Sequence, residues 1–234
     1  MKLTIALNGE EREFDVPANT TLLSLLRGQA HCFSVKHGCE TGECGACAVI
    51  VDGRIVNACI LLAAQADERE VITLEGIPWI LATLNAVTPN VERPPTAGAD
   101  PAIQPNPSEP PTESRSSFQN PAAFSREEHP SAYELLHPVQ QAFVDTHAIQ
   151  CGYCTPGMIL SSLALFAEKG FINLPSIKRK TRVRSGRRKS GSKGPLLSEQ
   201  EIRDALAGNL CRCTGYVKPV DAVLQAAEKL ITER

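Results

Sequence analysis

The stretch that decides the fold is GCETGECGACAVIVDGRIVNAC, residues 38–59. Its four cysteines are Cys39, Cys44, Cys47 and Cys59. The glycines among the first three permit left-handed backbone and a close approach of the chain to a bound group. Their amides can also point at sulfur atoms and stabilise negative charge there. The stretch therefore predicts four thiolates that converge on a metal group.

The spacing C-x4-C-x2-C of the first three cysteines is the one used by plant-type 2Fe–2S ferredoxins. A tetrahedral zinc site with four cysteine ligands is the alternative, since such sites are common. Ordinary buried cysteines are disfavoured, because three cysteines within nine residues, threaded with glycine, do not suit a simple apolar core.

Two later motifs carry a second group of cysteines. They are QCGYCTPGM, residues 150–158, with Cys151 and Cys154, and GNLCRCTGY, residues 208–216, with Cys211 and Cys213. We expect each pair to lie at a helix N-terminus, where the thiolate pKa is lowered. Zinc would tolerate this set too, whereas a thioredoxin-like dithiol lacks its βαβ context.

The residues around the first cysteine group predict a small α+β unit over residues 1–77. Residues 2–7 alternate as a strand does, and Asn8-Gly9 is a two-residue hairpin signal before a return strand. Thr20 or Thr21 can cap a short apolar helix that Gly28 ends. The ninth cysteine, Cys32, is predicted to be a buried core thiol.

Residues 135–234 predict a helical domain. Its four expected helices lie in residues 137–149, 156–170, 198–208 and 218–231. The third opens on a capping box from Ser198 to Glu201. An insertion at about residues 175–195 interrupts this domain, and nine lysines and arginines lie between Lys178 and Lys193 with no acidic residue among them.

Residues 78–134 predict a mostly disordered linker. Ten prolines fall between Pro89 and Pro130, among polar residues. Such a composition cannot bury enough apolar surface to offset the entropy of ordering.

The bulk composition is that of a globular protein, with 42% hydrophobic residues and a net charge of −2. No stretch approaches the ~18 consecutive apolar residues of a membrane span, and the N-terminus has no signal-peptide core. We expect a cytoplasmic protein, in which nine cysteines serve as metal ligands or redox groups rather than as disulfides.

Taken together, the two cysteine motifs closely resemble the small iron–sulfur subunit of the molybdenum hydroxylases, the family of xanthine dehydrogenase, aldehyde oxidoreductase and carbon monoxide dehydrogenase. The resemblance covers about residues 1–77, 135–174 and 196–234. It implies an N-terminal β-grasp ferredoxin domain and a C-terminal four-helix domain, each carrying one 2Fe–2S cluster. The long linker and the basic insertion depart from typical members, but neither removes a cysteine.

The resemblance also implies a role and partners. The chain would be the electron-transfer subunit of an oxidoreductase, with no catalytic residue of its own. Gln150 matches the position that contacts the molybdopterin cofactor, which a large catalytic subunit holds. The helical-domain cluster would lie nearest that cofactor, and the ferredoxin-domain cluster would pass electrons to FAD in a medium subunit.

Two other functions fit parts of the sequence. A zinc-stabilised module could bind nucleic acid through the basic run, but that run has no interleaved aromatic residues for base stacking. We therefore expect no nucleic-acid partner. The other function is that of a free two-cluster ferredoxin, but such a protein would have no use for a pterin contact at Gln150.

Overall fold

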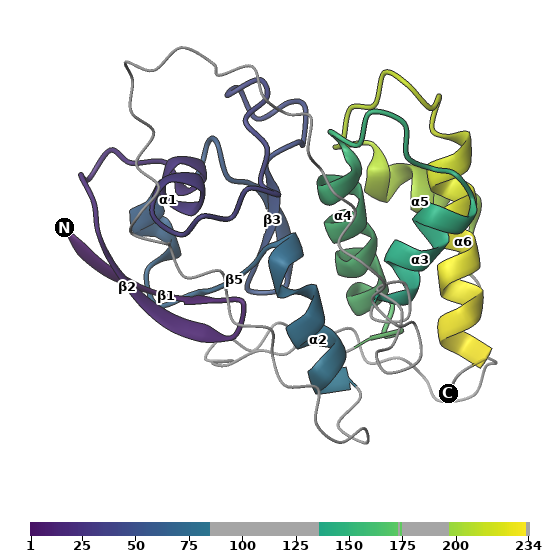
Figure 1. Ribbon diagram of the computed structural model, residues 1–234, viewed down its shortest axis with the longest axis horizontal. Helices are drawn as coiled ribbons and strands as arrows, with labels where there is room; N and C mark the ends of the chain where they lie inside the picture. Colours follow the sequence, from purple (N-terminus) through teal and green to yellow (C-terminus); the bar gives the residue numbers. More distant parts are fainter. Residues whose placement is uncertain (85–135, 173, 175–196, 233–234) are drawn as a thin grey trace, which may run out of the picture.

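The computed structural model describes residues 1–84, 136–172, 174 and 197–232. Within these residues the chain forms a five-stranded mixed sheet and six α-helices, in two parts that pack side by side (Figure 1). The sheet and two helices belong to the N-terminal part, and four helices form the C-terminal part. The predicted α+β class is confirmed.

The sheet has the strand order β2-β1-β5-β3-β4. The strands are β1 (Lys2–Leu7), β2 (Glu10–Asp15), β3 (Ala48–Val51), β4 (Arg54–Asn57) and β5 (Glu70–Ile72). Strands β1 and β5 run parallel, and the other neighbours are antiparallel.

Two tight turns fix the register of the hairpins. Asn8 and Gly9 have φ values of 52° and 87°, and Asp52 and Gly53 have values of 49° and 79°. Positive φ at both central residues is the geometry of the type I′ turn, whose twist matches that of paired strands. The first turn lies where the sequence predicted it, and Asp52-Gly53 carries the same two-residue hairpin signal.

Helix α1 (Leu22–Gly28) covers one face of the sheet. The hydroxyl of Thr21 accepts a hydrogen bond from the amide of Ser24 at 3.1 Å and caps the helix, as predicted. Side chains alternate across a strand, so β3 directs Val49 and Val51 into the core under α1 and Ile50 to the opposite face. A single strand therefore serves two cores.

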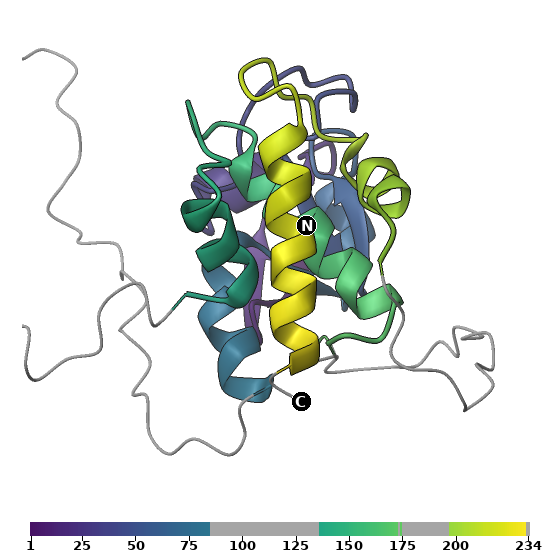
Figure 2. The same cartoon turned by 90° about the vertical axis from the view of Figure 1, so that its right-hand side faces the viewer.

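The C-terminal part is built from four helices, as predicted. They are α3 (Pro138–Asp145), α4 (Thr155–Glu168), α5 (Glu199–Leu206) and α6 (Val217–Thr232). Helix α5 opens on the predicted capping box, in which the Ser198 hydroxyl accepts from the amide of Glu201 and the Glu201 carboxylate accepts from the amide of Ser198. Figure 2 shows α6 running across the outer side of this part, with the sheet behind it.

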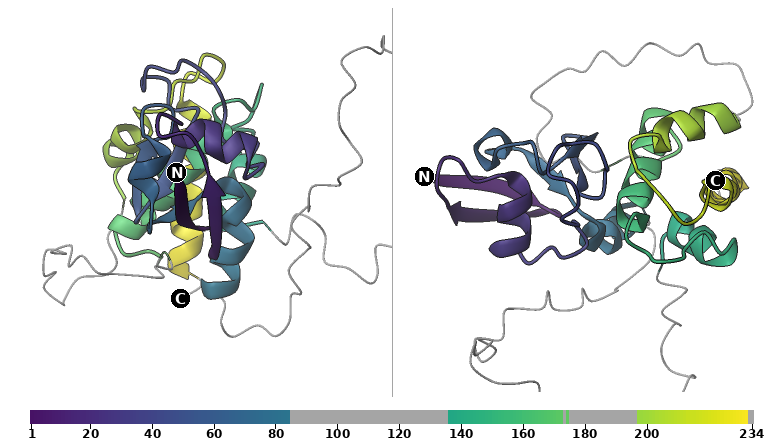
Figure 3. Two further views of the ribbon diagram at one scale, coloured as in Figure 1. Left: turned by 90° about the vertical axis from the view of Figure 1, so that its left-hand side faces the viewer. Right: turned by 90° about the horizontal axis from the view of Figure 1, so that it is seen from above.

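The two parts share one apolar core. Helix α4 packs directly against β3 (Figure 3, right). Ile50 and Ile72 on the open face of the sheet join Phe143, Leu160 and Phe166 of the helical part in a single buried cluster. Since all five side chains are at most 1% exposed, separating the two parts would expose a large apolar area.

Helix α2 (Ile77–Leu84) begins at the expected boundary of the N-terminal domain and continues into the first residues assigned to the linker. Ile77 and Ile80 are fully buried in the shared core. The remainder of the predicted linker and the whole of the basic insertion at residues 175–195 lie outside the described residues. No helix of the described part is long and apolar enough to cross a membrane.

Candidate metal centres

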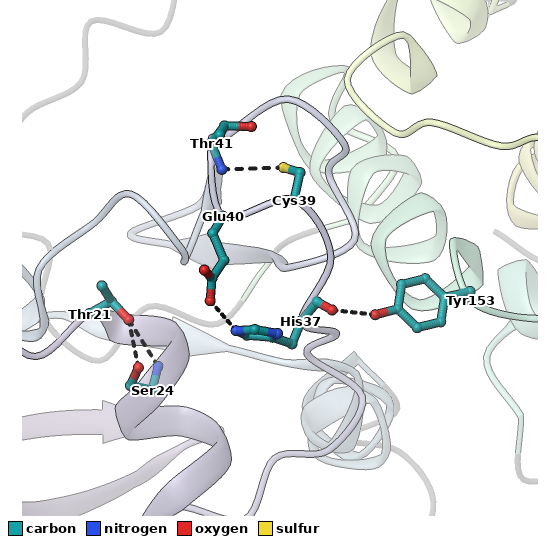
Figure 4. A network of polar contacts seen from close by, with 7 residues as sticks. All are labelled: Thr21, Ser24, His37, Cys39, Glu40, Thr41 and Tyr153. Carbon is teal, nitrogen blue, oxygen red and sulfur yellow. Dashed lines mark hydrogen bonds and ion pairs between the residues drawn. The ribbon is translucent and has the colours of Figure 1, made fainter.

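The first cysteine group lies on the loop before β3 and at the end of β4. This loop is tightly wound, because Glu40, Gly42 and Gly45 all have φ values between 59° and 81°. The amides of Thr41 and Cys44 both donate to the sulfur of Cys39 at 3.4 Å; Figure 4 shows the contact from Thr41. The backbone thus directs its N–H groups at sulfur, as the glycine-rich sequence predicted.

These donors favour the thiolate form of Cys39. Hydrogen bonds from the side chain of Thr41, the amide of Cys44 and the amide of Thr41 lower the pKa of Cys39 to about 5. A group that is ionised near neutral pH is ready to bind a metal cation.

The other two thiols of this group, Cys47 and Cys59, are buried and neighbour each other. Burial, together with the neighbouring Cys59 and Cys44 thiols, raises the pKa of Cys47 to about 11. Such a thiol ionises at neutral pH only when a cation compensates its charge. The site therefore has the donors of a metal centre, and a bound cation would favour the thiolate form of Cys47.

The second cysteine group joins the start of α4 to the loop between α5 and α6. Cys154 is the N-terminal cap residue of α4, and its thiol contacts that of Cys211. The thiols of Cys151 and Cys213 are exposed and form a second contact. The structure thus brings together two cysteine pairs separated by more than fifty residues of sequence.

The pKa shifts in this group differ from one cysteine to the next. Burial alone would raise the pKa of Cys211, but hydrogen bonds from the side chain and backbone of Thr214 lower it overall; the Thr214 hydroxyl lies 3.1 Å from the sulfur. Burial, followed by the contact with Cys211, raises the pKa of Cys154 to about 12. The lowering expected there from the helix N-terminus is therefore wrong for Cys154, because burial and the neighbouring Cys211 and Cys151 disfavour its thiolate form.

Within each group, every cysteine interacts with others of the same group. The interactions join Cys39 to Cys44, Cys47 to Cys59 and Cys44, Cys154 to Cys211 and Cys151, and Cys213 to Cys151 and Cys211. No three His, Cys, Asp or Glu side chains of the described part group around one ion position. Four neighbouring thiols per site match the ligand number of a binuclear cluster, in which each iron takes two cysteine ligands.

Gln150 and Cys32 lie in opposite environments. Gln150 is exposed beside the exposed Cys151. Cys32 is 4% exposed in the core under α1, and burial raises its pKa to about 11. The prediction of a buried core thiol at Cys32 is confirmed, and the pterin contact of Gln150 stays a prediction.

Sequence reasoning missed several polar residues that support the two sites. The Thr41 amide donates to the Cys39 sulfur, the Thr214 hydroxyl hydrogen-bonds with the Cys211 sulfur, and Tyr153 donates to the carbonyl oxygen of His37 (Figure 4). Each lies within three residues of a cysteine. Their position in the motifs was the available signal, but it did not reveal which groups they contact.

Comparison with known proteins supports this picture for both parts of the chain. A family model described as a 2Fe-2S iron-sulfur cluster binding domain matches residues 5–74. A second one, described as a 2Fe-2S binding domain, matches residues 126–224. The two models cover the two cysteine groups separately.

Curated relatives match over nearly the whole chain. The nicotinate dehydrogenase small FeS subunit of Eubacterium barkeri is 34% identical over 97% of this chain and 95% of its own length. The iron-sulfur-binding subunit of an aldehyde oxidoreductase from Escherichia coli K12 is 30% identical over 98% of this chain and 73% of its own.

Solved structures extend the likeness to three dimensions. The aldehyde oxidoreductase of Desulfovibrio desulfuricans is 30% identical with a TM-score of 0.63, and all of this chain corresponds to 17% of that one. A chain of quinoline 2-oxidoreductase from Pseudomonas putida 86 is 26% identical with a TM-score of 0.61, over 98% of this chain and 95% of its own length. This chain therefore aligns with a segment of the first protein and with almost all of a chain of the second.

Proposed function

The chain belongs to the family of small iron–sulfur subunits of the molybdenum hydroxylases, and from that premise we propose that it carries electrons from a molybdenum cofactor, through two 2Fe–2S clusters, towards FAD or another acceptor. Its role as an electron-transfer subunit of an oxidoreductase follows from the family. The route of the electrons and the groups at its two ends are the proposed part.

We propose that the two cysteine groups are the cluster ligands. Cys39, Cys44, Cys47 and Cys59 would hold one cluster, and Cys151, Cys154, Cys211 and Cys213 the other. The interactions among the cysteines within each group support this assignment. A bound 2Fe–2S cluster accepts and releases one electron at a time, at a potential set by charge, hydrogen bonds and exposure.

The chain's own residues prepare the two sites for negative charge. Amides of Thr41 and Cys44 donate to Cys39, and the Thr214 hydroxyl contacts Cys211. Hydrogen bonds to cysteine sulfur stabilise the added electron and raise the reduction potential. Burial of Cys47 and Cys59 keeps water away from one side of the first site.

One side of the second site is exposed, and this supports the proposal that this side faces a catalytic partner. Gln150, Cys151 and Cys213 all lie at the surface. We assign Gln150 as a molybdopterin contact, with the pterin held by a large catalytic subunit. The first site would then face a medium FAD subunit, and the complex would be cytoplasmic.

Metal analysis of the full chain tests the cluster assignment. Protein purified without oxygen should be brown and contain about four irons and four acid-labile sulfides per chain. Dithionite reduction should give two distinct electron paramagnetic resonance (EPR) signals. A colourless protein with stoichiometric zinc would overturn the proposal in favour of a zinc-stabilised module.

Co-purification tests the partners, because a free ferredoxin would be isolated alone. In the assembled complex, a Cys44→Ser variant should still allow substrate to reduce the second site, while turnover with the external acceptor collapses. Rapid-freeze EPR measurements separate these two steps. Full turnover in a variant that lacks the first signal would show that electrons leave by another route.

A further inference from the structure

The two cysteine sites are joined by a buried side chain, that of Asn209. This residue is 2% exposed and lies between α5 and Cys211. Its amide nitrogen Nδ2 donates to the carbonyl oxygen of Gly45 at 2.9 Å, and its Oδ1 accepts from the Ser161 hydroxyl at 2.7 Å. One side chain therefore connects the loop of the first site to α4 of the second.

A backbone hydrogen bond accompanies this contact. The amide of Leu210 donates to the carbonyl oxygen of Cys44 at 2.9 Å. Cys44 belongs to the first cysteine group, and Leu210 directly precedes Cys211 of the second. Only one hydrogen bond and a short run of backbone thus separate a cysteine of each group.

Two glycines make this close approach possible. A Cβ atom on Gly45 would lie 2.0 Å from the carbonyl oxygen of Gly208, and one on Gly157 would lie 2.6 Å from both Asn209 Nδ2 and the carbonyl oxygen of Gly45. Real Cβ contacts are not that short, so a side chain at Gly45 would push the two loops apart, and one at Gly157 would push both loops away from α4.

The loop that carries Asn209 is also held from within. The hydroxyl of Tyr216 donates to the carbonyl oxygen of Asn209 at 3.1 Å and accepts from the amide of Cys211 at 2.8 Å. Movement of Asn209 is therefore transmitted to Cys211. The buried side-chain amide of Asn209 uses both its donor and its acceptor, in the bonds to Gly45 and Ser161. Breaking either bond would leave buried polar atoms unpaired, which is costly.

We propose that Asn209 is a positioning residue that holds the two cysteine sites at one fixed separation and orientation. Asn209 is not itself a proposed cluster ligand. It acts through the carbonyl groups of Cys44 and Gly45 and through the loop to Cys211. The purpose of this arrangement rests on the proposed function, since the rate of electron transfer falls steeply with the distance between two centres.

The test uses the full chain with its clusters loaded and compares three variants. Asn209→Ala removes the side-chain link altogether. Asn209→Asp keeps an oxygen for the Ser161 hydroxyl but places an oxygen against the carbonyl of Gly45. The matched control, Ser161→Ala, removes the partner on α4 and leaves the bond from Asn209 to Gly45 in place.

Hydrogen exchange at the Leu210 amide is the first measurement. Loss of a buried hydrogen bond should speed this exchange by about tenfold or more in both Asn209 variants, and less in Ser161→Ala. Unchanged exchange in Asn209→Ala would overturn the proposal. The wild-type protein gives an independent test, because an unprotected Leu210 amide there would also overturn it, even if every variant failed to fold.

The dipolar splitting between the two reduced sites is the second measurement. Both Asn209 variants should retain the two EPR signals of the wild type, with a splitting that is smaller or broader. Retained signals with an unchanged splitting and a lowered melting temperature would mean that Asn209 acts on stability only, and the proposal would be wrong. Absence of both signals from the wild type would instead contradict the proposed function, so the two failures are distinguishable.

Discussion

The hydroxyl of Tyr153 donates a 2.6 Å hydrogen bond to the carbonyl oxygen of His37, across 116 residues of sequence. Tyr153 lies between Cys151 and Cys154, and His37 lies two residues before Cys39. Within the described part of the chain, this contact and those of Asn209 and Leu210 link the two sites at the residues that flank their cysteines.

Tyr153→Phe should lower the free energy of unfolding by no more than about 1 kcal/mol, because the lost hydrogen bond is exposed and water can replace it. Denaturant unfolding of the loaded protein measures this effect. A loss several times larger would mean that Tyr153 contributes as much to the interface as a buried residue does.

Cys44→Ser should remove one EPR signal and leave the other, and Cys154→Ser should do the converse. The reason is that each thiol contacts only cysteines of its own group. Cys32→Ser is the matched control and should leave both signals, because Cys32 lies in the apolar core under α1. Loss of both signals from one folded variant would contradict the division into two sites.

Gly9→Ala should destabilise the protein by about 3 kcal/mol, from backbone strain at positive φ and overpacking together. Gly9 has a φ of 87°, and a Cβ there would lie 2.3 Å from the Trp79 indole on α2. Gly53→Ala is the control, since Gly53 has a φ of 79° with no atom within 4 Å of the added carbon. It should cost about 1 kcal/mol; equal losses would mean that Trp79 moves aside freely.

The stability of the protein should fall in acid in part because of His137. This side chain is fully buried, its Nε2 has no partner among the described residues, and burial lowers its pKa from 6.5 to about 4. Between these two pH values the unfolded chain binds a proton that the folded chain does not. The free energy of unfolding should therefore decrease by up to about 1.4 kcal/mol per pH unit as the pH falls through this window.

His137→Asn should flatten that part of the pH profile while keeping a side-chain acceptor for the Val139 amide at the start of α3. Thermal unfolding of this variant and the wild type between pH 4 and about 6.5 gives the comparison. Identical slopes in His137→Asn and wild type would refute the assignment.

Deletion of residues 90–130, or of residues 177–193, should leave the iron content unchanged, because neither segment contains a cysteine. Loops can also change length at a small entropic cost. Iron analysis and EPR of the two deletion variants check this. Loss of iron from either would show that the deleted segment supports a site.

The sequence by itself determined those features that depend on neighbouring residues. Two hairpin turns were specified by the dipeptides Asn8-Gly9 and Asp52-Gly53. Two helix starts were specified by the capping residues Thr21 and Ser198. The spacing of the cysteines assigned them to two groups. Turns, caps and metal-binding loops are local, so short segments are enough to specify them.

Only the tertiary structure decided how the two parts meet. The sequence predicted two domains, but it did not show that Ile50 and Ile72 of the sheet are buried among the helices. Nor could the motif GNLCRCTGY reveal that Asn209 is buried against Gly45, 164 residues earlier. Periodicity shows that a side chain lies on an apolar face, but the partner of that face is chosen by packing between segments that are distant in the chain.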